Sequence, residues 1–86
     1  MSYYLYILKC ADGTLYTGIT VDLKRRIIEH NSSALGAKYT RGRRPVTLIF
    51  SKKFRTRSTA SVAESRIKKL SREEKLDVVK KYADRI

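Results

Sequence analysis

Cysteine and histidine, which commonly form disulfides and structural zinc sites, are almost absent from this sequence. It contains one cysteine, Cys10, and one histidine, His30. A lone cysteine cannot form an internal disulfide, and the two residues together are too few to hold a structural zinc ion. They can be written as a nucleophile pair, but nothing in the sequence places them together. We therefore exclude zinc-binding and disulfide-stabilised classes, and we expect a reduced, cytoplasmic protein.

Long apolar runs and targeting signals are missing as well. No stretch is long enough to span a bilayer, no lipidation motif is present, and the N-terminal MSYYLYIL is too short and too aromatic for a signal peptide. The glycine-rich motifs that cradle phosphates, G-x-x-x-x-G-K-[ST] and G-x-G-x-x-G, are also absent. These absences argue against membrane-spanning proteins and against the commonest nucleotide-binding enzymes.

Acidic residues are few, and basic residues dominate. The sequence has twenty Lys and Arg residues but only eight Asp and Glu residues, which gives a formal net charge of +12. Such a surface attracts polyanions and gains affinity by releasing their counterions. Nucleic acid is the expected partner, with an anionic membrane surface as the alternative. A hydrophobic fraction of 42% over 86 residues suffices for one packed core, so residues 1–86 are expected to form a single domain.

The N-terminal part of the chain predicts a β-hairpin. Residues 3–9 and 14–19 are rich in aromatic, aliphatic and β-branched side chains, which favour strands. Between them lies Asp12-Gly13, a strong turn signal because Gly supplies a positive φ and Asp tolerates one. The two segments are therefore expected to pair as neighbouring antiparallel strands.

Two tyrosines and a glycine are the notable residues of this hairpin. Alternation along the second strand puts Tyr16 and Gly18 on one face. A hairpin brings Tyr6, on the first strand, to the same rung as these residues or to a neighbouring one. A glycine inside a strand often marks the close approach of another chain or a ligand. Gly18 is therefore interpreted as a structural residue of a site that contains both tyrosines.

A helix is expected directly after the hairpin. Asp22 is a plausible N-cap for a helix over residues 23–31. Arg26 and His30 are four residues apart, so they share one face of that helix. Residues 32–44 contain small, glycine and basic residues and are expected to form a loop.

The remainder of the chain predicts one more strand and two more helices. The strand is expected over residues 45–51 at the edge of the sheet, with Val46, Leu48 and Phe50 pointing the same way. A Ser/Thr cluster at residues 58–61 begins a helix. The fold class is thus α+β in the order ββαβαα, a small and mainly antiparallel three-stranded sheet flanked by helices.

Two Ser-x-x-Glu patterns in this part have the form of a capping box. The pattern from Ser71 to Glu74 is expected to begin the last helix. Ser61-x-x-Glu64 has the same form, but Glu64 cannot cap if its helix begins nearer Ser58.

In this order the segments resemble the GIY-YIG nuclease family. The first half-motif keeps only its tyrosine, and a threonine replaces the isoleucine of the second. The likeness covers the whole chain and is greatest to the short stand-alone bacterial subgroup, UPF0213. The matching segments are Tyr4-Leu5-Tyr6, Tyr16-Thr17-Gly18, residues 20–31 and residues 60–70.

The resemblance implies a metal-dependent endonuclease that hydrolyses DNA phosphodiester bonds. Glu64 would bind one Mg²⁺ or Mn²⁺ ion, since a hard cation is commonly held by one carboxylate, waters and substrate oxygens. Arg26 would contact the scissile phosphate through its guanidinium fork. Tyr6 and Tyr16 would position or deprotonate the attacking water, and the sequence leaves open which of them is the base. His30 would share the proton or bind a phosphate oxygen.

Several further residues are expected to contact nucleic acid, with Tyr39 stacking on a base. The family likeness implies branched or single-stranded DNA as substrate and a role in DNA repair. The alternatives are a non-catalytic basic nucleic-acid-binding protein that retains the fold, or a small ribosome-associated basic protein. Binding through charge alone would need none of the five site residues in particular, which favours the nuclease. The expected contacts are Arg25, Lys38, Tyr39, Arg41, Arg43, Arg44 and Lys68.

Overall fold

The computed structural model describes residues 2–32 and 35–83 and contains a three-stranded antiparallel sheet. The strands are β1 (Tyr3–Lys9), β2 (Leu15–Thr20) and β3 (Thr47–Phe54), arranged in the order β2-β1-β3. β1 pairs with both neighbours, which places β3 at an edge of the sheet. The expectation of a small antiparallel sheet with β3 at its edge is confirmed.

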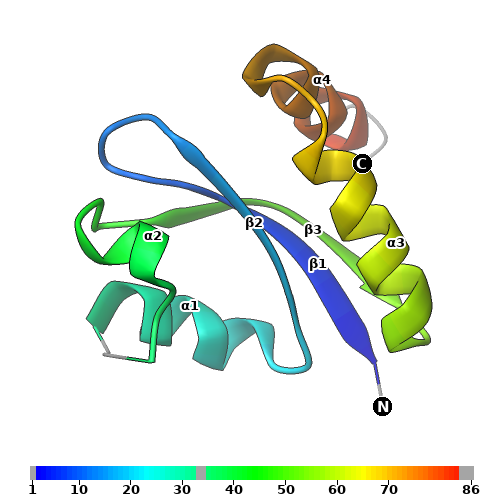
Figure 1. The fold of residues 1–86 in the computed structure, drawn as a ribbon, viewed down its shortest axis with the longest axis horizontal. Helices are drawn as coiled ribbons and strands as arrows, with labels where there is room; N and C mark the ends of the chain where they lie inside the picture. Colours follow the sequence, from blue (N-terminus) through cyan, green and yellow to red (C-terminus); the bar gives the residue numbers. More distant parts are fainter. Residues whose placement is uncertain (1, 33–34, 84–86) are drawn as a thin grey trace.

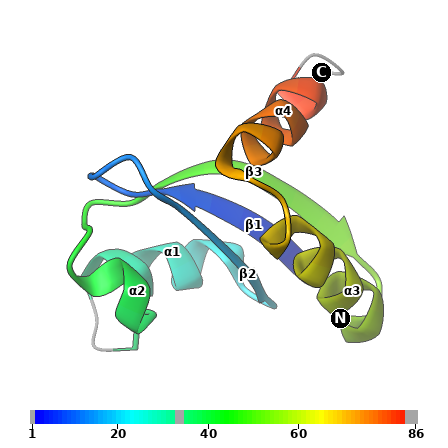
Figure 2. The same ribbon diagram turned by 45° about the horizontal axis from the view of Figure 1, so that its top comes forward.

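Helices cover the two faces of the sheet. Figures 1 and 2 show α1 (Leu23–Ser32) and α2 (Lys38–Arg41) on one side, and α3 (Arg57–Lys68) and α4 (Arg72–Ala83) on the other. The element order is therefore ββααβαα, because the short α2 lies within the segment that was expected to be a loop. No helix within the described ranges is long and apolar enough to cross a membrane.

Local side-chain hydrogen bonds explain where several elements begin. In the hairpin turn Gly13 has φ of 84°, and the Asp12 carboxylate accepts from the backbone N–H of Thr14. The Asp22 carboxylate accepts from the N–H of Arg25, as an N-cap does. The hairpin turn and the first N-cap thus follow the predictions made from the sequence.

The last two helices are capped differently. α3 has Thr56 as its N-cap, accepting from the N–H of Thr59 at 3.1 Å. At the start of α4, Glu74 N–H donates to the Ser71 hydroxyl, and the Glu74 carboxylate accepts from Ser71 N–H. This reciprocal pair is the expected capping box. Because α3 begins at Arg57, the alternative Ser61-x-x-Glu64 box is wrong.

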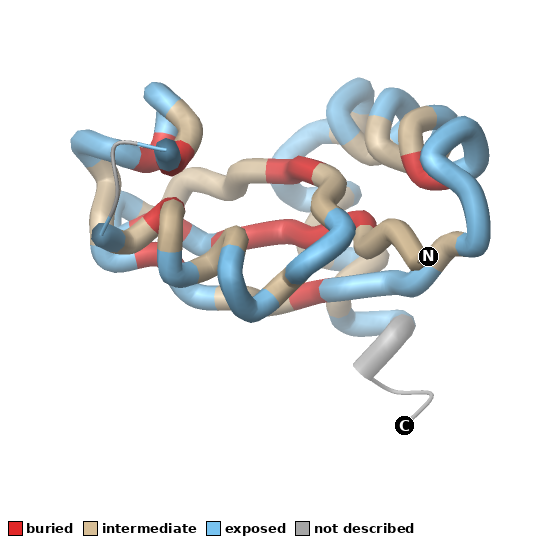
Figure 3. Tube along the Cα trace, turned by 90° about the horizontal axis from the view of Figure 1, so that it is seen from below, coloured by how far each residue is buried: buried red, intermediate tan, exposed pale blue. Residues whose placement is uncertain are grey.

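The core is organised around the central strand β1, whose middle is buried, as Figure 3 shows, whereas its ends are not. Tyr6 and Leu8 pack with Cys10 and Val46 on the face that α1 covers, and Ile27 of α1 lies against this cluster. Cys10 is thus a buried core residue.

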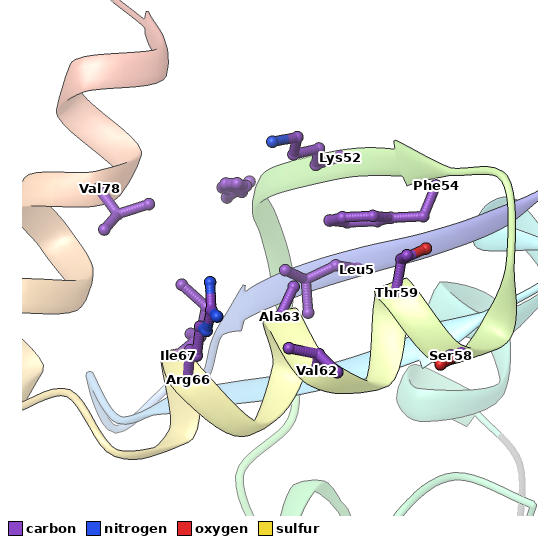
Figure 4. Close-up of a pocket in the computed structure, with 11 residues that line it drawn as sticks. Leu5, Lys52, Phe54, Ser58, Thr59, Val62, Ala63, Arg66, Ile67 and Val78 are labelled. Atoms are coloured by element: carbon purple, nitrogen blue, oxygen red, sulfur yellow. The ribbon is translucent and has the colours of Figure 1, made fainter.

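The opposite face of β1 packs against α3. Leu5 and Phe50 line a mostly apolar groove of about 450 Å³ together with Val62 and Ala63 of α3. Figure 4 shows this groove between β3, α3 and Val78 of α4.

The prediction that Val46, Leu48 and Phe50 point the same way is wrong for Phe50. The pairing of β1 with β3 shifts by one residue, so Ile7 faces Phe50 whereas the next residue, Leu8, faces Leu48. One extra residue on β3 reverses the alternation, as a β-bulge does. Val46 and Leu48 therefore pack on the α1 side, whereas Phe50 lines the groove at α3.

Candidate active site

Tyr6 and His30 form the buried centre of the candidate site. The Tyr6 hydroxyl and Nε2 of His30 are 2.9 Å apart and hydrogen-bonded. Tyr6 is only 1% exposed and His30 is fully buried. The two residues come from β1 and α1, so the contact joins the sheet to the helix that follows the hairpin. The expected meeting of these two residues occurs.

Tyr16 packs on both of these side chains and remains half-buried. Its ring centroid lies 6.4 Å from that of Tyr6 and 5.1 Å from that of His30. On the register of the hairpin Tyr6 faces Gly18, two residues beyond Tyr16, so both tyrosines lie on the same face of the sheet. The structure thus brings together the hairpin tyrosines and the α1 histidine.

Gly18 makes room for the Tyr6 side chain. A Cβ atom at this position would lie 2.6 Å from the Tyr6 hydroxyl oxygen and 2.8 Å from Cζ. Distances that short do not occur between unbonded heavy atoms of this kind. The close approach inferred from a glycine inside a strand is therefore real, and the approaching group is the protein's own tyrosine.

Burial determines the ionisation of the central pair. It raises the pKa of Tyr6 to about 12, and the neighbouring Arg26 guanidinium only partly offsets the effect. Burial, assisted by the positive charge of Arg26, lowers the pKa of His30 to about 4. Both side chains are therefore uncharged at neutral pH.

Arg26 lies at the margin of this cluster and is held by its own helix and the following segment. Its Nη1 donates to the Glu29 carboxylate at 3.1 Å and to the Leu35 carbonyl at 2.6 Å. Arg25 also pairs with Glu29, but its side chain is 73% exposed. Glu29 was not identified from the sequence, although its spacing of three and four residues from the two arginines is the signal for such pairs.

Glu64 approaches the site from α3, on the other side of the sheet. Its charge acts on Tyr6 and contributes to the raised pKa of that phenol. The side chain is 23% exposed, and the nearest Lys68 ammonium nitrogen is 3.6 Å from its carboxylate. It lies well inside α3 and is not used for capping.

A single carboxylate of this kind suits Mg²⁺, which keeps most of its waters and needs only one or two protein oxygens. Across residues 2–32 and 35–83 there is no cluster of three or more potential metal ligands. The residues present therefore fit a partly hydrated ion held at Glu64, and they do not fit a fully protein-enclosed metal site.

The segment of residues 35–44, here called the strap, organises the α1 side of the site. Thr40 is fully buried, and its Oγ1 lies 2.9 Å from Nδ1 of His30. Arg44 donates to the His30 carbonyl at 2.6 Å. Gly36 is needed for the close packing, since a Cβ there would lie 2.6 Å from the Glu29 carbonyl. No periodicity or motif in the sequence indicated these contacts.

The strap also reaches the exposed side of Tyr16. The Tyr39 ring centroid is 5.8 Å from that of Tyr16, and the Arg43 guanidinium lies 4.1 Å above the Tyr39 ring. Arg43 is also ion-paired with Asp12 of the hairpin turn at 3.1 Å. Tyr39 and Arg43, expected to contact nucleic acid, therefore have internal partners that connect the strap to the hairpin.

The other residues expected to contact nucleic acid differ in their surroundings. Lys38 and Arg41 are exposed on α2, and Lys68 is exposed beside Glu64. Arg44 is half-buried and bonded to His30, so its first role is structural.

Comparison with known proteins agrees with this architecture. The family model described as the GIY-YIG catalytic domain matches residues 2–77, so the chain belongs to the GIY-YIG family. Within this family it is 57% identical over 79 residues to a UPF0213 protein of Desulfotalea psychrophila, covering 92% of this chain and 72% of the relative. A UPF0213 protein of Syntrophus aciditrophicus is 48% identical over 83 residues, covering 96% of this chain and 95% of that one.

A solved structure confirms the fold. The solution NMR structure of a protein from E. faecalis shares 46% sequence identity and superposes with a TM-score of 0.68. The alignment covers 96% of this chain and 88% of that chain. The α+β fold expected from the sequence is therefore the fold of the family.

Proposed function

We propose that this protein is a metal-dependent endonuclease that hydrolyses DNA phosphodiester bonds. The observation that carries the proposal is the meeting of Tyr6, Tyr16 and His30 beside the Arg26 guanidinium, with the Glu64 carboxylate close enough to act on Tyr6. The GIY-YIG catalytic domain extends over all five residues. Nucleic acid also suits the net charge of +12.

The roles follow from charge and access. Arg26 is a charged partner of Tyr6, and its guanidinium suits the oxygens of the scissile phosphate. Glu64 would hold one Mg²⁺ or Mn²⁺ ion. When bound, that ion supplies a positive charge that offsets phosphoryl charge and stabilises the leaving oxygen. Arg26 comes from α1 and Glu64 from α3, and the charge of each acts on Tyr6.

Tyr16 is the better candidate for the phenol that meets the attacking water. Tyr6 is 1% exposed, and its hydroxyl is already bonded to His30. Tyr16 is half-buried and packs on that pair, so part of its side chain remains accessible. We therefore assign the general base to Tyr16 and a supporting role to Tyr6.

The exposed basic residues near the site are proposed to position the DNA. Lys38 and Arg41 lie on α2, and Arg25 lies on the exposed side of α1. Phosphate contacts of this kind give affinity without sequence preference. Branched or single-stranded DNA is the proposed substrate, and DNA repair in the cytoplasm the proposed setting.

The test is cleavage of labelled single-stranded, duplex, flap and junction DNAs with Mg²⁺ or Mn²⁺ and with chelator. Glu64→Gln keeps the side-chain size and removes the charge, so it should abolish cleavage while DNA binding stays equal or becomes slightly tighter. Glu73→Gln on exposed α4 removes the same charge away from the site and should cleave as wild type. Wild-type cleavage by Glu64→Gln would show that the ion is held elsewhere. Binding by the wild type without cleavage of any substrate would favour the non-catalytic alternative.

A further inference from the structure

Three buried side chains form a continuous hydrogen-bonded chain behind the site. The Tyr6 hydroxyl contacts Nε2 of His30 at 2.9 Å, and Nδ1 of His30 contacts Oγ1 of Thr40 at 2.9 Å. Oγ1 of Thr40 also lies 2.9 Å from the carbonyl oxygen of Ala37. Tyr6, His30 and Thr40 are each at most 1% exposed. The position of each hydrogen atom in this chain is therefore set by the protein rather than by water.

The Ala37 carbonyl sets the direction of the chain. A carbonyl oxygen can only accept, so the Thr40 hydroxyl donates its single hydrogen to Ala37. Oγ1 of Thr40 is then an acceptor toward His30, which places the ring hydrogen on Nδ1. A neutral imidazole with hydrogen on Nδ1 has a lone pair on Nε2. The Tyr6 hydroxyl accordingly donates to Nε2.

The opposite tautomer leaves a more deeply buried hydrogen-bond donor without an acceptor. If Nε2 carried the hydrogen, it would donate to Tyr6, and the hydroxyl hydrogen of Tyr6 would have no acceptor among the described residues, at a site 1% exposed. A buried donor without an acceptor forfeits its hydration with nothing in return, which is costly. The direction chosen here costs the hydrogen bond that the Ala37 N–H donates to Nδ1, because a protonated Nδ1 cannot accept it. That group is 3.5 Å from Nδ1 and belongs to a half-buried residue, so little is lost.

We propose that Thr40 is a positioning residue that fixes His30 in the Nδ1–H tautomer and thereby makes Tyr6 a hydrogen-bond donor. The chain holds the Tyr6 ring against Gly18 and against Tyr16, so Thr40 acts on the accessible tyrosine through two intervening side chains. The catalytic consequence rests on the proposed nuclease function, whereas the tautomer does not.

The tautomer is directly measurable because His30 is the single histidine of the chain. Long-range nitrogen–proton NMR correlation on protein labelled at the histidine ring nitrogens gives one set of signals. We expect Nδ1 to resonate as a protonated nitrogen and Nε2 as an unprotonated one. Thr40→Ser retains the hydroxyl and should keep this pattern. Thr40→Val retains the shape but cannot accept from Nδ1–H, so the hydrogen should move to Nε2, with Nδ1 accepting from the Ala37 N–H.

The kinetic readout is a second and separate test. With DNA cleavage as the assay, Thr40→Val should lower kcat with little change in KM; the loss of a partner that orients a metal-binding histidine, an analogous case, typically costs roughly 10- to 100-fold. Thr40→Ser should restore most of kcat. A protonated Nε2 in the wild-type spectrum overturns the proposal whatever the cleavage assay gives, including when Thr40→Val does not fold. An Nδ1–H spectrum in a protein that cleaves no DNA supports the tautomer assignment while the nuclease function fails.

Discussion

Gly18→Ala is expected to be among the most damaging small substitutions in this protein. The added Cβ would lie 2.6 Å from the Tyr6 hydroxyl oxygen, and an ordinary contact begins at 3.4 Å. One of the two groups must therefore move by about 0.8 Å, the difference between these distances. Displacing the hydroxyl by that amount along its bond would stretch the 2.9 Å contact with His30 to about 3.7 Å, beyond hydrogen-bonding distance.

The cost has two parts. Overpacking a well-packed site typically costs about 1 to 3 kcal/mol. Leaving a buried polar group unsatisfied adds about 1 to 3 kcal/mol. The free energy of unfolding should thus fall by about 2 to 6 kcal/mol, against about 5 to 15 kcal/mol for a whole domain. In a domain of this size each kcal/mol corresponds to about 4 to 8 °C, so Tm should fall by about 10 °C or more.

Gly42→Ala is the matched control. Among residues 2–32 and 35–83 no atom lies within 4 Å of the Cβ that would be added there, and Gly42 has φ of −89°, which any residue adopts. Its Tm should therefore stay close to that of the wild type, when both variants are melted under the same conditions and followed by far-UV circular dichroism. If Gly18→Ala had the same Tm as Gly42→Ala, the inferred contact between Gly18 and Tyr6 would be refuted, and with it the fixed position of Tyr6.

Two further predictions concern the buried histidine and a helix cap. Because the pKa of His30 is lowered to about 4 from 6.5, the unfolded chain binds a proton between these values that the folded chain does not. The contribution of His30 to the free energy of unfolding should be full above about pH 6.5, and that free energy should fall by about 3 kcal/mol as the pH approaches 4. In urea titrations His30→Gln should show a flatter dependence on pH. A His30→Gln profile parallel to that of the wild type would contradict the assignment. Ser71→Ala removes the hydroxyl half of the α4 capping box and should lower the free energy of unfolding by about 1 kcal/mol in the same assay. Ser65→Ala, at an exposed position of α3, should lower it much less. Equal losses in the two variants would count against the cap.

The parts of the fold that were predictable from the sequence depend on local chemistry. The hairpin follows from Asp12-Gly13 and from two flanking segments of strand-forming residues, and the alternation then fixes that Tyr6 and Tyr16 share a face. The capping box at Ser71 is local in the same sense, since both of its partners lie within one helical turn. Such features need no knowledge of the tertiary structure.

The features that were missed depend on contacts between distant segments. The bulge that turns Phe50 toward α3 is set by pairing with β1, not by the sequence of β3 alone. Thr40 is an ordinary residue in a basic, glycine-containing stretch until the strap folds back on α1. The sequence indicates Arg43 and Arg44 as phosphate contacts because it displays their charge. It does not display their partners, Asp12 and the His30 carbonyl, which lie far away along the chain.

The two sides of the candidate site are held very differently. On the α1 side, His30 is bonded at both ring nitrogens, and Tyr6 is fixed between His30 and Gly18. On the α3 side, the Glu64 carboxylate has an ion pair with Lys68 at 3.6 Å, and such exposed pairs along a helix contribute little. A carboxylate that is loosely held can turn toward a divalent ion at small cost. Lys68, displaced from Glu64 by that ion, would then be available to a phosphate. The fixed Tyr6 and the loosely held Glu64 thus match the roles proposed for them. The protein itself positions Tyr6, whereas the Glu64 carboxylate can turn toward a metal ion that arrives with DNA.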